Sequence, residues 1–584
     1  KVDSPIACVP RPATLGDIFH SNPVVVRSPN RLVFGDPSYN AFKTHYSTTY
    51  PRDRILYAGT NAGFLEAIHT GDWDTSQTPP NYDAGTGAEI FGFMPWEARL
   101  KIKNLPVDPA TSRTHYVDGD PQSSDVWFYN PFDPSNGAKN VDGSEWRTIL
   151  VGSMREGGHQ YFALDITNPN GSPQPGGGAP LAYPGYLWEF PTEADATAGG
   201  GYFEWMGETW GKPIVTKLRL MVAGVGPVER WVVIVTAGYD PNGDPNPPDV
   251  TGLAAPTYNV ADPAVDPDAK KGRAIFILDA MTGEVIAMKG YDPASGDAQE
   301  KMRYAIVGRP SVLDLNADGF ADIIYFVDMG GQVFKWVISK PGEDCVNDGT
   351  CDSSQPNWPF KLFFTAPVGK ISGTDFYKNL FFSPAAAYSG GQLWLAFGSG
   401  ERRSLSFGGI GGDPDSNIKE NNRYYVVSDP DPYERLATPL PALTEVDLMD
   451  LTSDQDGANV TGRGFYFRVG NGEKFVTNTE IFAGHVIAAS FKPTTGGDPC
   501  TARGDGTLYV FDLRTGEGYF QDASSNPTRG LDIGAGLPTD PQVSVGAGGA
   551  DNKVIIEKSG TDIERIEEQN INVGGGLLYW RERF

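Results

Sequence analysis

One strand–turn–strand unit recurs along the chain and limits the folds that it can adopt. The unit is an apolar strand, a Gly-rich turn, a second apolar strand and a polar turn that often reads Asp-x-x-Thr-Gly. Six clear copies and a weaker seventh begin, in order, at Ile55, Thr148, Val232, Asp322, Gln392, His485 and Gln542. Because a recurring unit is the signature of repeat architectures, we interpret the chain as one repetitive fold.

Each unit is predicted to be a β-meander. Apolar residues alternate in stretches such as Ala274–Asp279 and Leu508–Asp512, which is typical of strands rather than helices. Asp279–Gly283 and Asp512–Gly516 are nearly identical turns, in which Asp can bond the backbone two residues on and Gly accepts a positive φ. A single meander cannot bury both of its faces, so the copies must stack, and radial stacking gives a propeller.

The predicted fold class is therefore all-β, a modified seven-bladed β-propeller with long loop insertions. Seven blades of about 40 to 50 residues account for roughly 315 residues. We expect a single domain over residues 1–584, with a two-domain arrangement as the alternative, because the first insertion is long enough to form a small cap. The insertions are predicted near 70–119, 240–271, 341–359 and 407–421, which are rich in Pro, Gly or Asp.

Composition excludes some partners. The 47 Lys and Arg against 73 Asp and Glu give a net charge of −26, which argues against nucleic acid because its phosphates require basic contacts. No apolar run approaches the roughly 18 residues of a membrane helix, so we expect no membrane span in this chain. The chain opens with KVDSPIACVP and no leader, which indicates a processed or truncated piece of a longer protein.

The four cysteines favour an oxidising exterior. Cys345 and Cys351 lie in a polar loop, where the five residues between them allow a disulfide; two free thiols are the alternative. Cys8 and Cys500 are the pair left over. There is no Cys-x-x-Cys motif, so neither a zinc ribbon nor a thioredoxin-like site is expected.

The strongest local motif is an acidic loop, Asp314-Leu-Asn316-Ala-Asp318-Gly-Phe320-Ala-Asp322. Side-chain oxygens stand at loop positions 1, 3, 5 and 9, and Gly stands at position 6, as in calcium-binding loops. We expect these four side chains and the backbone carbonyl of Phe320 to bind Ca²⁺, which prefers six to eight oxygen ligands. Position 12 is Tyr325 rather than the bidentate Glu of an EF-hand.

Two simpler interpretations stand beside the calcium site. The loop could be an Asx-rich turn that matches by coincidence, but three carboxylates close together without a cation would repel one another. Asp240, Asn242 and Asp244 form a poorer imitation, because their Gly and Pro neighbours fall at the wrong positions, and we interpret them as a plain polar loop.

Several stretches together resemble the C-terminal propeller of the PilC/PilY family of type IV pilus tip adhesins. They are LGDIFHSNPVVV from Leu15, ILYAGTNAGFLEAI from Ile55, GAEIFGFMPW from Gly87, WGKPIV from Trp210, PSVLDLNADGFADIIYFVDMGGQVFKW from Pro310, GDGTLYVFDLRTG from Gly504, IGAGLPTDPQVSV from Ile533 and the ending LLYWRERF. The resemblance spans almost the whole chain.

The resemblance implies a quinoprotein-like propeller that bacteria export to the extracellular pilus tip or cell surface. Minor pilins at the pilus tip and a host or abiotic surface would be its partners, and pilus assembly, attachment and twitching motility its functions. It implies that Asp314, Asn316, Asp318, the Phe320 carbonyl and Asp322 hold calcium, which would oppose pilus retraction. Many members also have an N-terminal adhesive region, and nothing here matches it.

Catalytic alternatives have less support, and we expect no enzymatic activity. A periplasmic quinoprotein-like oxidoreductase would commonly carry adjacent cysteines beneath its cofactor, and this chain has no Cys-Cys. A carbohydrate-binding or carbohydrate-processing propeller is the other alternative, since 73 acidic residues offer many carboxylate pairs. Arg503-Gly504-Asp505 spells an integrin-recognition tripeptide, but we interpret it as part of a hairpin turn.

The histidines give no catalytic or metal motif. They form no His-Glu-x-x-His and no close cluster along the sequence, so we expect each to be a packing or surface residue rather than a metal ligand or base. The six are His20, His45, His69, His115, His159 and His485.

Overall fold

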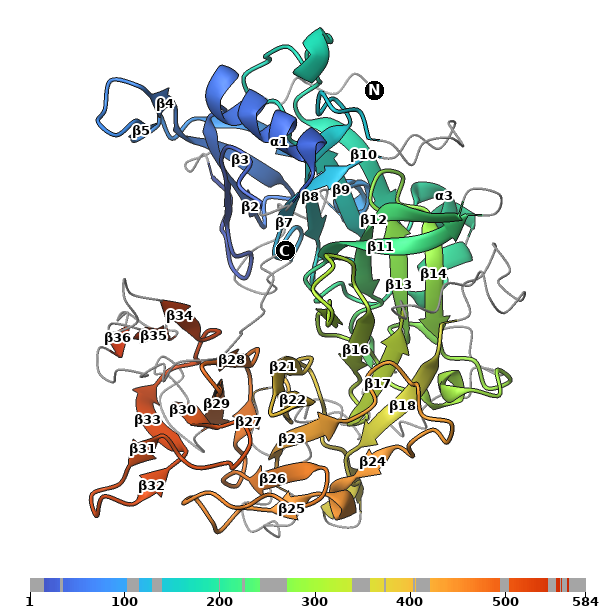
Figure 1. Ribbon diagram of the computed structural model, residues 1–584, viewed down its shortest axis with the longest axis vertical. Helices are drawn as coiled ribbons and strands as arrows, with labels where there is room; N and C mark the ends of the chain where they lie inside the picture. The colour runs from blue at the N-terminus through green and yellow to red at the C-terminus, as the bar shows by residue number, and fades with distance from the viewer. Residues whose placement is uncertain are drawn as a thin grey trace, which may run out of the picture. The chain divides into compact units, whose positions relative to one another are not determined.

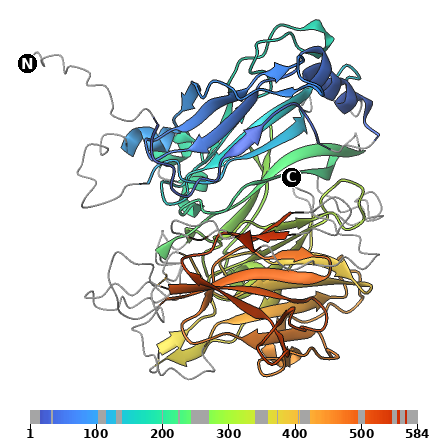
Figure 2. The same cartoon turned by 90° about the vertical axis from the view of Figure 1, so that its left-hand side faces the viewer.

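Strands dominate the computed structural model of the chain (Figures 1 and 2). Contacts between residues divide the chain into two compact units: residues 1–130, 138–203 and 208–213 form the first, and 131–137, 204–207 and 214–584 the second. The structure describes residues 15–31, 35–101, 115–128, 139–198, 200–222, 226–241, 270–338, 358–371, 374–402, 405, 421–493, 504–544, 553–556, 558 and 565–566.

The first unit contains two four-stranded antiparallel sheets, in the orders β1-β2-β3-β6 and β10-β9-β8-β7. Their strands are β1 (Val24–Val26), β2 (Arg54–Gly59), β3 (Leu65–Gly71), β6 (Glu89–Phe93), β7 (Gln122–Trp127), β8 (Trp146–Ser153), β9 (Tyr161–Asp165) and β10 (Gly185–Phe190). The two sheets share a core that includes Tyr57, Leu65, Leu150 and Phe162.

Short helices and a ribbon complete the first unit. They are α1 (Pro37–Thr44), which continues into a π-helical turn (His45–Thr49), α2 (Trp96–Lys101), α3 (Glu193–Ala198), the 3-10 turn Pro175–Gly177 and the ribbon of β4 (Trp73–Asp74) and β5 (Asn81–Tyr82); a further 3-10 turn covers Gly201–Trp205. Asp36 caps α1 by accepting hydrogen bonds from the backbone N–H groups of Ser38 and Tyr39.

The second unit contains four sheets of four or five strands. The first two have the orders β11-β12-β13-β14 and β15-β16-β17-β18-β24. Their strands are β11 (Ile214–Val222), β12 (Gly226–Thr236), β13 (Ala274–Asp279), β14 (Val285–Gly290), β15 (Ser311–Leu313), β16 (Ile323–Val327), β17 (Gln332–Val337), β18 (Phe360–Thr365) and β24 (Leu443–Thr444).

The other two large sheets have the orders β21-β22-β23-β26-β25 and β27-β29-β30-β33, with β28 also paired to β29, and β34, β35 and β36 form a smaller sheet. Their strands are β21 (Ala385–Ser389), β22 (Gln392–Gly398), β23 (Arg423–Asp429), β25 (Met449–Asp450), β26 (Gly464–Arg468), β27 (Lys474–Phe475), β28 (Glu480–Phe482), β29 (His485–Pro493), β30 (Gly504–Asp512), β33 (Gly530–Ala535), β34 (Gln542–Ser544), β35 (Lys553–Ile555) and β36 (Arg565–Ile566). Minor elements are the ribbons β19 (Gly369–Ile371) with β20 (Thr374–Phe376) and β31 (Phe520–Gln521) with β32 (Pro527–Thr528), and the 3-10 turns Ala298–Lys301 and Glu445–Asp447.

The repeat predicted from the sequence corresponds to the sheets. Each of the six clear copies supplies two adjacent interior strands of one sheet, namely β2 and β3, β8 and β9, β12 and β13, β16 and β17, β22 and β23, and β29 and β30. The weaker seventh copy supplies β34 and β35. The all-β class and the meander units are therefore confirmed, whereas the seven blades and the closure of a ring stay predictions.

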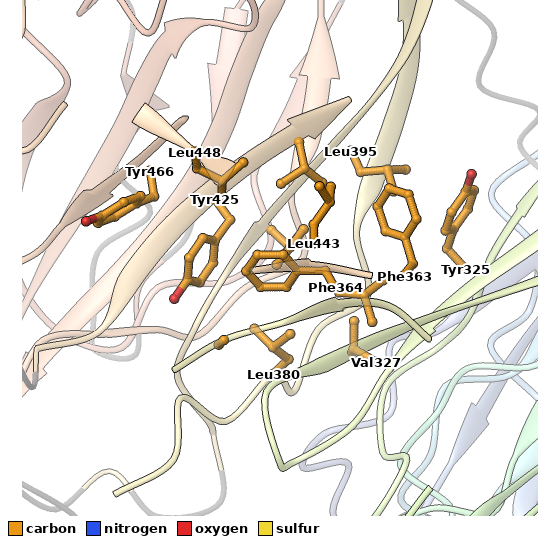
Figure 3. Close-up of a cluster of buried hydrophobic side chains, with 14 of the residues drawn as sticks. Tyr325, Val327, Phe363, Phe364, Leu380, Leu395, Tyr425, Leu443, Leu448 and Tyr466 are labelled. Atoms are coloured by element: carbon orange, nitrogen blue, oxygen red, sulfur yellow. The ribbon is translucent and has the colours of Figure 1, made fainter. Parts of the chain in front are cut away.

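Consecutive sheets of the second unit pack face to face. On β16, the alternate residues Tyr325 and Val327 lie in a cluster with β22 and β23 (Figure 3), whereas Ile324 and Phe326 lie in a cluster with β12 and β13. Within the first cluster, the ring centroids of Phe364 and Tyr425 are 4.9 Å apart. Burial on both faces explains why β16 is a continuous apolar run rather than an alternating one.

Several predictions fall on residues outside the described part of the chain. These include all four cysteines, Arg503, Asn242, Asp244 and most of the insertions at 240–271, 341–359 and 407–421. Gly504 and Asp505 are described, and they begin the strand β30, paired with β29, so their assignment to a hairpin turn was wrong. The range 70–119, which we expected to be an insertion, contains β6, the fourth strand of the first sheet. None of the described helices is both long enough and apolar enough to span a membrane.

Candidate functional site

The acidic loop joins β15 to β16. The two strands are antiparallel, with Leu313 opposite Ile323, and the Asp322 N–H donates to the Leu313 carbonyl at 2.7 Å, so the pairing holds the two ends of the loop together. Ala317 and Gly319 adopt positive φ angles of 58° and 83°. The second of these explains the Gly at loop position 6, because other residues rarely adopt this conformation.

Backbone N–H groups of the loop point at its own acidic side chains. Asp314 accepts hydrogen bonds from Gly319 at 2.7 Å and from Asp318 at 3.2 Å. The Asn316 side-chain oxygen accepts from the Asp318 N–H at 3.0 Å, and the Asp318 carboxylate accepts from the Phe320 N–H at 2.9 Å. Four of the five predicted ligand residues are thus linked to one another in a compact turn.

Asp322 is the buried member of the set, with no exposed surface. Its Oδ2 accepts from the Leu315 N–H at 2.9 Å and from the Tyr433 hydroxyl at 3.0 Å. Its Oδ1 is buried and has no hydrogen-bond partner among the residues that the structure describes. A buried carboxylate oxygen without a partner is costly, so this atom provides a ready ligand for a cation.

The electrostatics of the loop are those of crowded carboxylates. Burial, together with the smaller effect of the charges of Asp314 and Asp318, raises the pKa of Asp322 to about 6, although hydrogen bonds from Leu315 and Tyr433 act against it. Burial also raises the pKa of Asp314, and the nearby Asp318 acts in the same direction. Both effects disfavour the ionised forms, and a bound divalent cation would reverse them.

Two basic residues of β11 flank the loop. Arg219 donates to Asp318 Oδ2 at 3.1 Å, and the Arg219 guanidinium lies 4.5 Å from the ring centroid of Phe320. The Lys217 ammonium lies 4.4 Å from the same centroid, and the Lys217 carbonyl accepts from the Ala321 N–H at 2.9 Å. The loop is therefore attached to the neighbouring sheet and partly neutralised by it.

The predicted ligands share one loop but are not all gathered at one point. Within the described part of the chain, two groups of three metal-ligating side chains have atoms within 4.8 Å of one another, and the three Asp of the loop are not among them. Asp318 turns toward Arg219, and Asp322 turns toward Tyr433. To bind a single ion together with the other ligands, the Asp318 carboxylate would therefore have to leave Arg219 and turn toward the ion.

Two other groups of potential metal ligands do come together in the structure, and the sequence motifs did not predict them. They are His20 with His115 and Asp118, and His69 with Asp53 and Asp72. His20 and His115, which form no cluster along the sequence and which we expected to be packing or surface residues, have ring centroids 5.9 Å apart. Their separation by almost a hundred residues hides the pair from any local motif. The one available signal was that His20 belongs to the stretch LGDIFHSNPVVV.

Fold and site together define an all-β protein of stacked antiparallel sheets with an acidic loop between two strands. No protein-family model matches the chain. It is 25% identical over 561 residues to a type IV pilus biogenesis factor PilY1 homolog of Xylella fastidiosa, covering 91% of this chain and 31% of the relative. It is 26% identical over 334 residues to PilY1 of Pseudomonas aeruginosa, covering 56% of this chain and 21% of that protein.

A solved structure agrees with these relatives. The crystal structure of the Pseudomonas aeruginosa PilY1 C-terminal domain matches with a TM-score of 0.55 at 18% identity, covering 93% of this chain and 100% of that one. The resemblance noted in the sequence is confirmed: the chain is similar to PilY1 proteins and shares the fold of the PilY1 C-terminal domain.

Proposed function

We propose that this chain is the propeller region of a type IV pilus biogenesis factor. The observation that supports this role is the similarity to PilY1 proteins, which extends over 91% of the chain in one relative. The match covers 31% and 21% of the lengths of the Xylella fastidiosa and Pseudomonas aeruginosa relatives, so the names of those proteins describe more than the matched region. We propose a non-enzymatic component at the extracellular pilus tip, which contacts minor pilins and supports assembly, surface attachment and twitching motility.

We further infer that the loop binds Ca²⁺ through Asp314, Asn316, Asp318, the Phe320 carbonyl and Asp322. The buried, unbonded Oδ1 of Asp322 carries this inference. Hard oxygen ligands from a tight loop suit calcium better than a transition metal. Tyr325, at loop position 12, donates its hydroxyl to Asp429 at 2.6 Å, so it is already engaged elsewhere.

The loop is well placed to couple calcium to the packing of neighbouring sheets. Ala321 is bonded to Lys217 on β11, and Asp322 is bonded to Tyr433, which follows β23. An ion that orders the loop would therefore act on three consecutive sheets of the second unit. This coupling supports a role in which calcium adjusts the surface that meets the pilus.

Calcium binding is tested by calorimetric titration of the chain with Ca²⁺ after chelation. We expect one site in the unaltered protein and a loss of at least tenfold in affinity in Asp318→Ala. The matched control is Asp522→Ala, because Asp522 is exposed like Asp318 and also accepts backbone hydrogen bonds in a tight turn, but lies outside the loop. Equal calcium binding by both variants and the unaltered chain would refute the site.

The pilus role is tested in the bacterium that carries the gene. Deletion of the full-length protein should abolish twitching, and the intact gene should restore it. If the Asp318→Ala gene restores only part of the twitching, calcium binding contributes to motility. If it restores twitching fully, calcium binding and motility are independent. Normal piliation and twitching in the deletion strain would refute the pilus role whatever the calcium result.

A further inference from the structure

Two segments of the first unit bring His20, His115 and Asp118 together, and a third lies beside them. His20 precedes β1, and the other two residues precede β7. His20 Nδ1 lies 2.5 Å from Asp118 Oδ2, and His115 Nδ1 lies 3.4 Å from the same oxygen. The Asp118 side chain is 1% exposed, and those of His20 and His115 are 22% and 14% exposed. Two imidazoles therefore turn the same ring nitrogen toward one buried carboxylate.

The third segment contributes a second carboxylate on the far side of His115. Glu156, in the β8–β9 turn, places Oε2 3.2 Å from His115 Nε2. A neutral imidazole has one N–H, so it can donate to only one of two flanking carboxylates. If Glu156 accepts from Nε2, the lone pair of Nδ1 faces Asp118 Oδ2. A protonated imidazole would donate to both carboxylates, whereas beside a neutral one a bound cation would satisfy the Nδ1 lone pair and Asp118 Oδ2 together.

We propose that His20 Nδ1, His115 Nδ1 and Asp118 Oδ2 form a site for a divalent transition metal ion of the zinc type. Imidazole and carboxylate ligands suit zinc, whereas calcium and magnesium prefer sites made of oxygen alone. Glu156 would orient His115 through its other ring nitrogen, as carboxylates commonly do behind metal-bound histidines. This site is separate from the acidic loop and does not depend on the proposed pilus role.

The spacing of the ligand atoms suits this ion. Zinc–ligand bonds of about 2.0–2.1 Å in a tetrahedron place ligand atoms roughly 3.3 Å apart. The His115–Asp118 separation of 3.4 Å already meets this value, and the His20–Asp118 pair at 2.5 Å would have to open slightly. Three protein ligands leave a fourth position for water, and the partial exposure of His20 gives solvent a path to it.

Backbone contacts hold the three segments in place without the ion. The Asn61 N–H donates to the Asp17 carbonyl at 2.9 Å, and the His20 N–H donates to Asp118 Oδ1 at 3.1 Å. A Cβ atom on Gly157 would lie 1.7 Å from the Tyr116 carbonyl oxygen, so glycine allows the β8–β9 turn to pack against the segment that carries His115. The site is pre-organised, and a metal ion would fasten the segment before β1 to the second sheet.

The other group, His69 with Asp53 and Asp72, makes a weaker site. His69 Nε2 lies 3.0 Å from Asp72 and 3.9 Å from Asp53, but the Asp72 side chain is 61% exposed. The second ring nitrogen of His69 contacts the Thr86 hydroxyl at 3.0 Å rather than a carboxylate. We therefore use this group as a comparison in the test.

The test is zinc titration of the intact chain at constant calcium, with bound metal measured by elemental analysis and Co²⁺ used as a spectroscopic substitute. We expect one equivalent of zinc and a visible Co²⁺ absorption band, both lost in His20→Gln and His115→Gln. His45→Gln is the matched control, because His45 lies in the same unit and its ring Nε2 contacts the Pro173 carbonyl at 2.8 Å rather than a carboxylate. Unchanged binding in His20→Gln and His115→Gln, or loss only in His69→Gln, would overturn the proposal.

A second variant separates metal binding from folding. Glu156 is a partly exposed side chain outside the ligand set, so Glu156→Gln should preserve circular dichroism and calcium binding. We expect it to weaken zinc about 10- to 100-fold, the usual effect of removing a hydrogen-bond partner of a metal-bound histidine. An unchanged zinc affinity in this variant would overturn the orienting role of Glu156.

Discussion

Asp322 links calcium affinity to pH. Burial raises the pKa of its carboxyl to about 6, above the ordinary value of 3.8, so the folded, calcium-free chain binds this proton more tightly than the unfolded chain. Stability of the calcium-free form should consequently fall as pH rises from about 4 to 6. Because calcium requires the ionised carboxylate, its affinity should drop about tenfold for each pH unit below about 6. Calorimetry from pH 5 to 7.5 checks this, and a flat affinity profile would contradict it.

Arg219 competes with calcium for Asp318. The ion pair is 3.1 Å long, and both side chains are about one-third exposed, so it is worth at most about 1 kcal/mol. We expect Arg219→Gln to strengthen calcium binding, by up to about fivefold, because the ion no longer has to displace a guanidinium. Arg514→Gln, in a distant turn of the second unit, is the control for a general change in net charge. Weaker calcium binding in Arg219→Gln would mean that the arginine supports the site.

Glu97 is an acid-sensitive residue of the first unit. Its burial alone would raise the pKa, but the hydrogen bond and charge of His159 and the charge of Lys101 outweigh burial and lower the pKa to about 2. The stability that Glu97 provides should be present above about pH 4.5 and lost as pH falls toward 2. Glu97→Gln should cost about 2 kcal/mol at pH 7, and its deficit should shrink on acidification. Urea unfolding of this variant and of Glu284→Gln at several pH values measures the difference.

Whether a site residue could be predicted from the sequence depends on how far along the chain it lies from its partners. The five ligands of the acidic loop lie within nine residues, so their chemistry can be recognised from spacing alone. The contacts of Arg219 and Tyr433 with that loop depend on the packing of other sheets, which no local motif encodes. The same limit applies to His20 and His115, which come together only when the strands that follow them belong to adjacent sheets.

At the scale of elements, strand positions were predictable because each repeat buries its central strands. Apolar runs such as β16 and β17 follow from packing on both faces, and the Asp-x-x-Thr-Gly turns fix where one strand ends. The outer strands were less visible in the sequence. β6 lies in a stretch rich in Gly and Pro and has exposed positions, so composition alone suggested an insertion.

Lys335 shows how a charged residue can stabilise the core of β17. Its ammonium has no exposed surface and lies 2.7 Å from Asp429 Oδ2 and 2.8 Å from the Asp431 carbonyl. Asp429 ends strand β23 of the next sheet, and Asp431 follows that strand. Lys335→Ala would leave Asp429 buried without its counter-charge, so we expect a loss of about 3–5 kcal/mol in the free energy of unfolding. The exposed control Lys301→Ala should change it by less than about 0.5 kcal/mol. Similar unfolding curves for both variants would contradict this role.

At the scale of the whole chain, the repeat predicted a series of similar sheets, but it did not predict that the sheets would divide into two compact units. Six of the seven copies look alike in sequence, yet the first two belong to one compact unit and the remaining ones to another. Nothing in the repeats distinguishes these groups, because each copy contributes similar apolar strands. The division is a property of packing between copies.

The division into units implies that the two proposed ions act on different parts of the chain. Calcium should protect amides of the acidic loop, of β11 near Lys217 and of the segment around Tyr433, because all three are joined by hydrogen bonds. Zinc should protect the segments around His20 and His115 in the first unit instead. Hydrogen exchange followed by mass spectrometry, with each ion added separately, measures both patterns. Protection by calcium in the first unit, or uniform protection by either ion, would show that these hydrogen bonds do not determine which amides each ion protects.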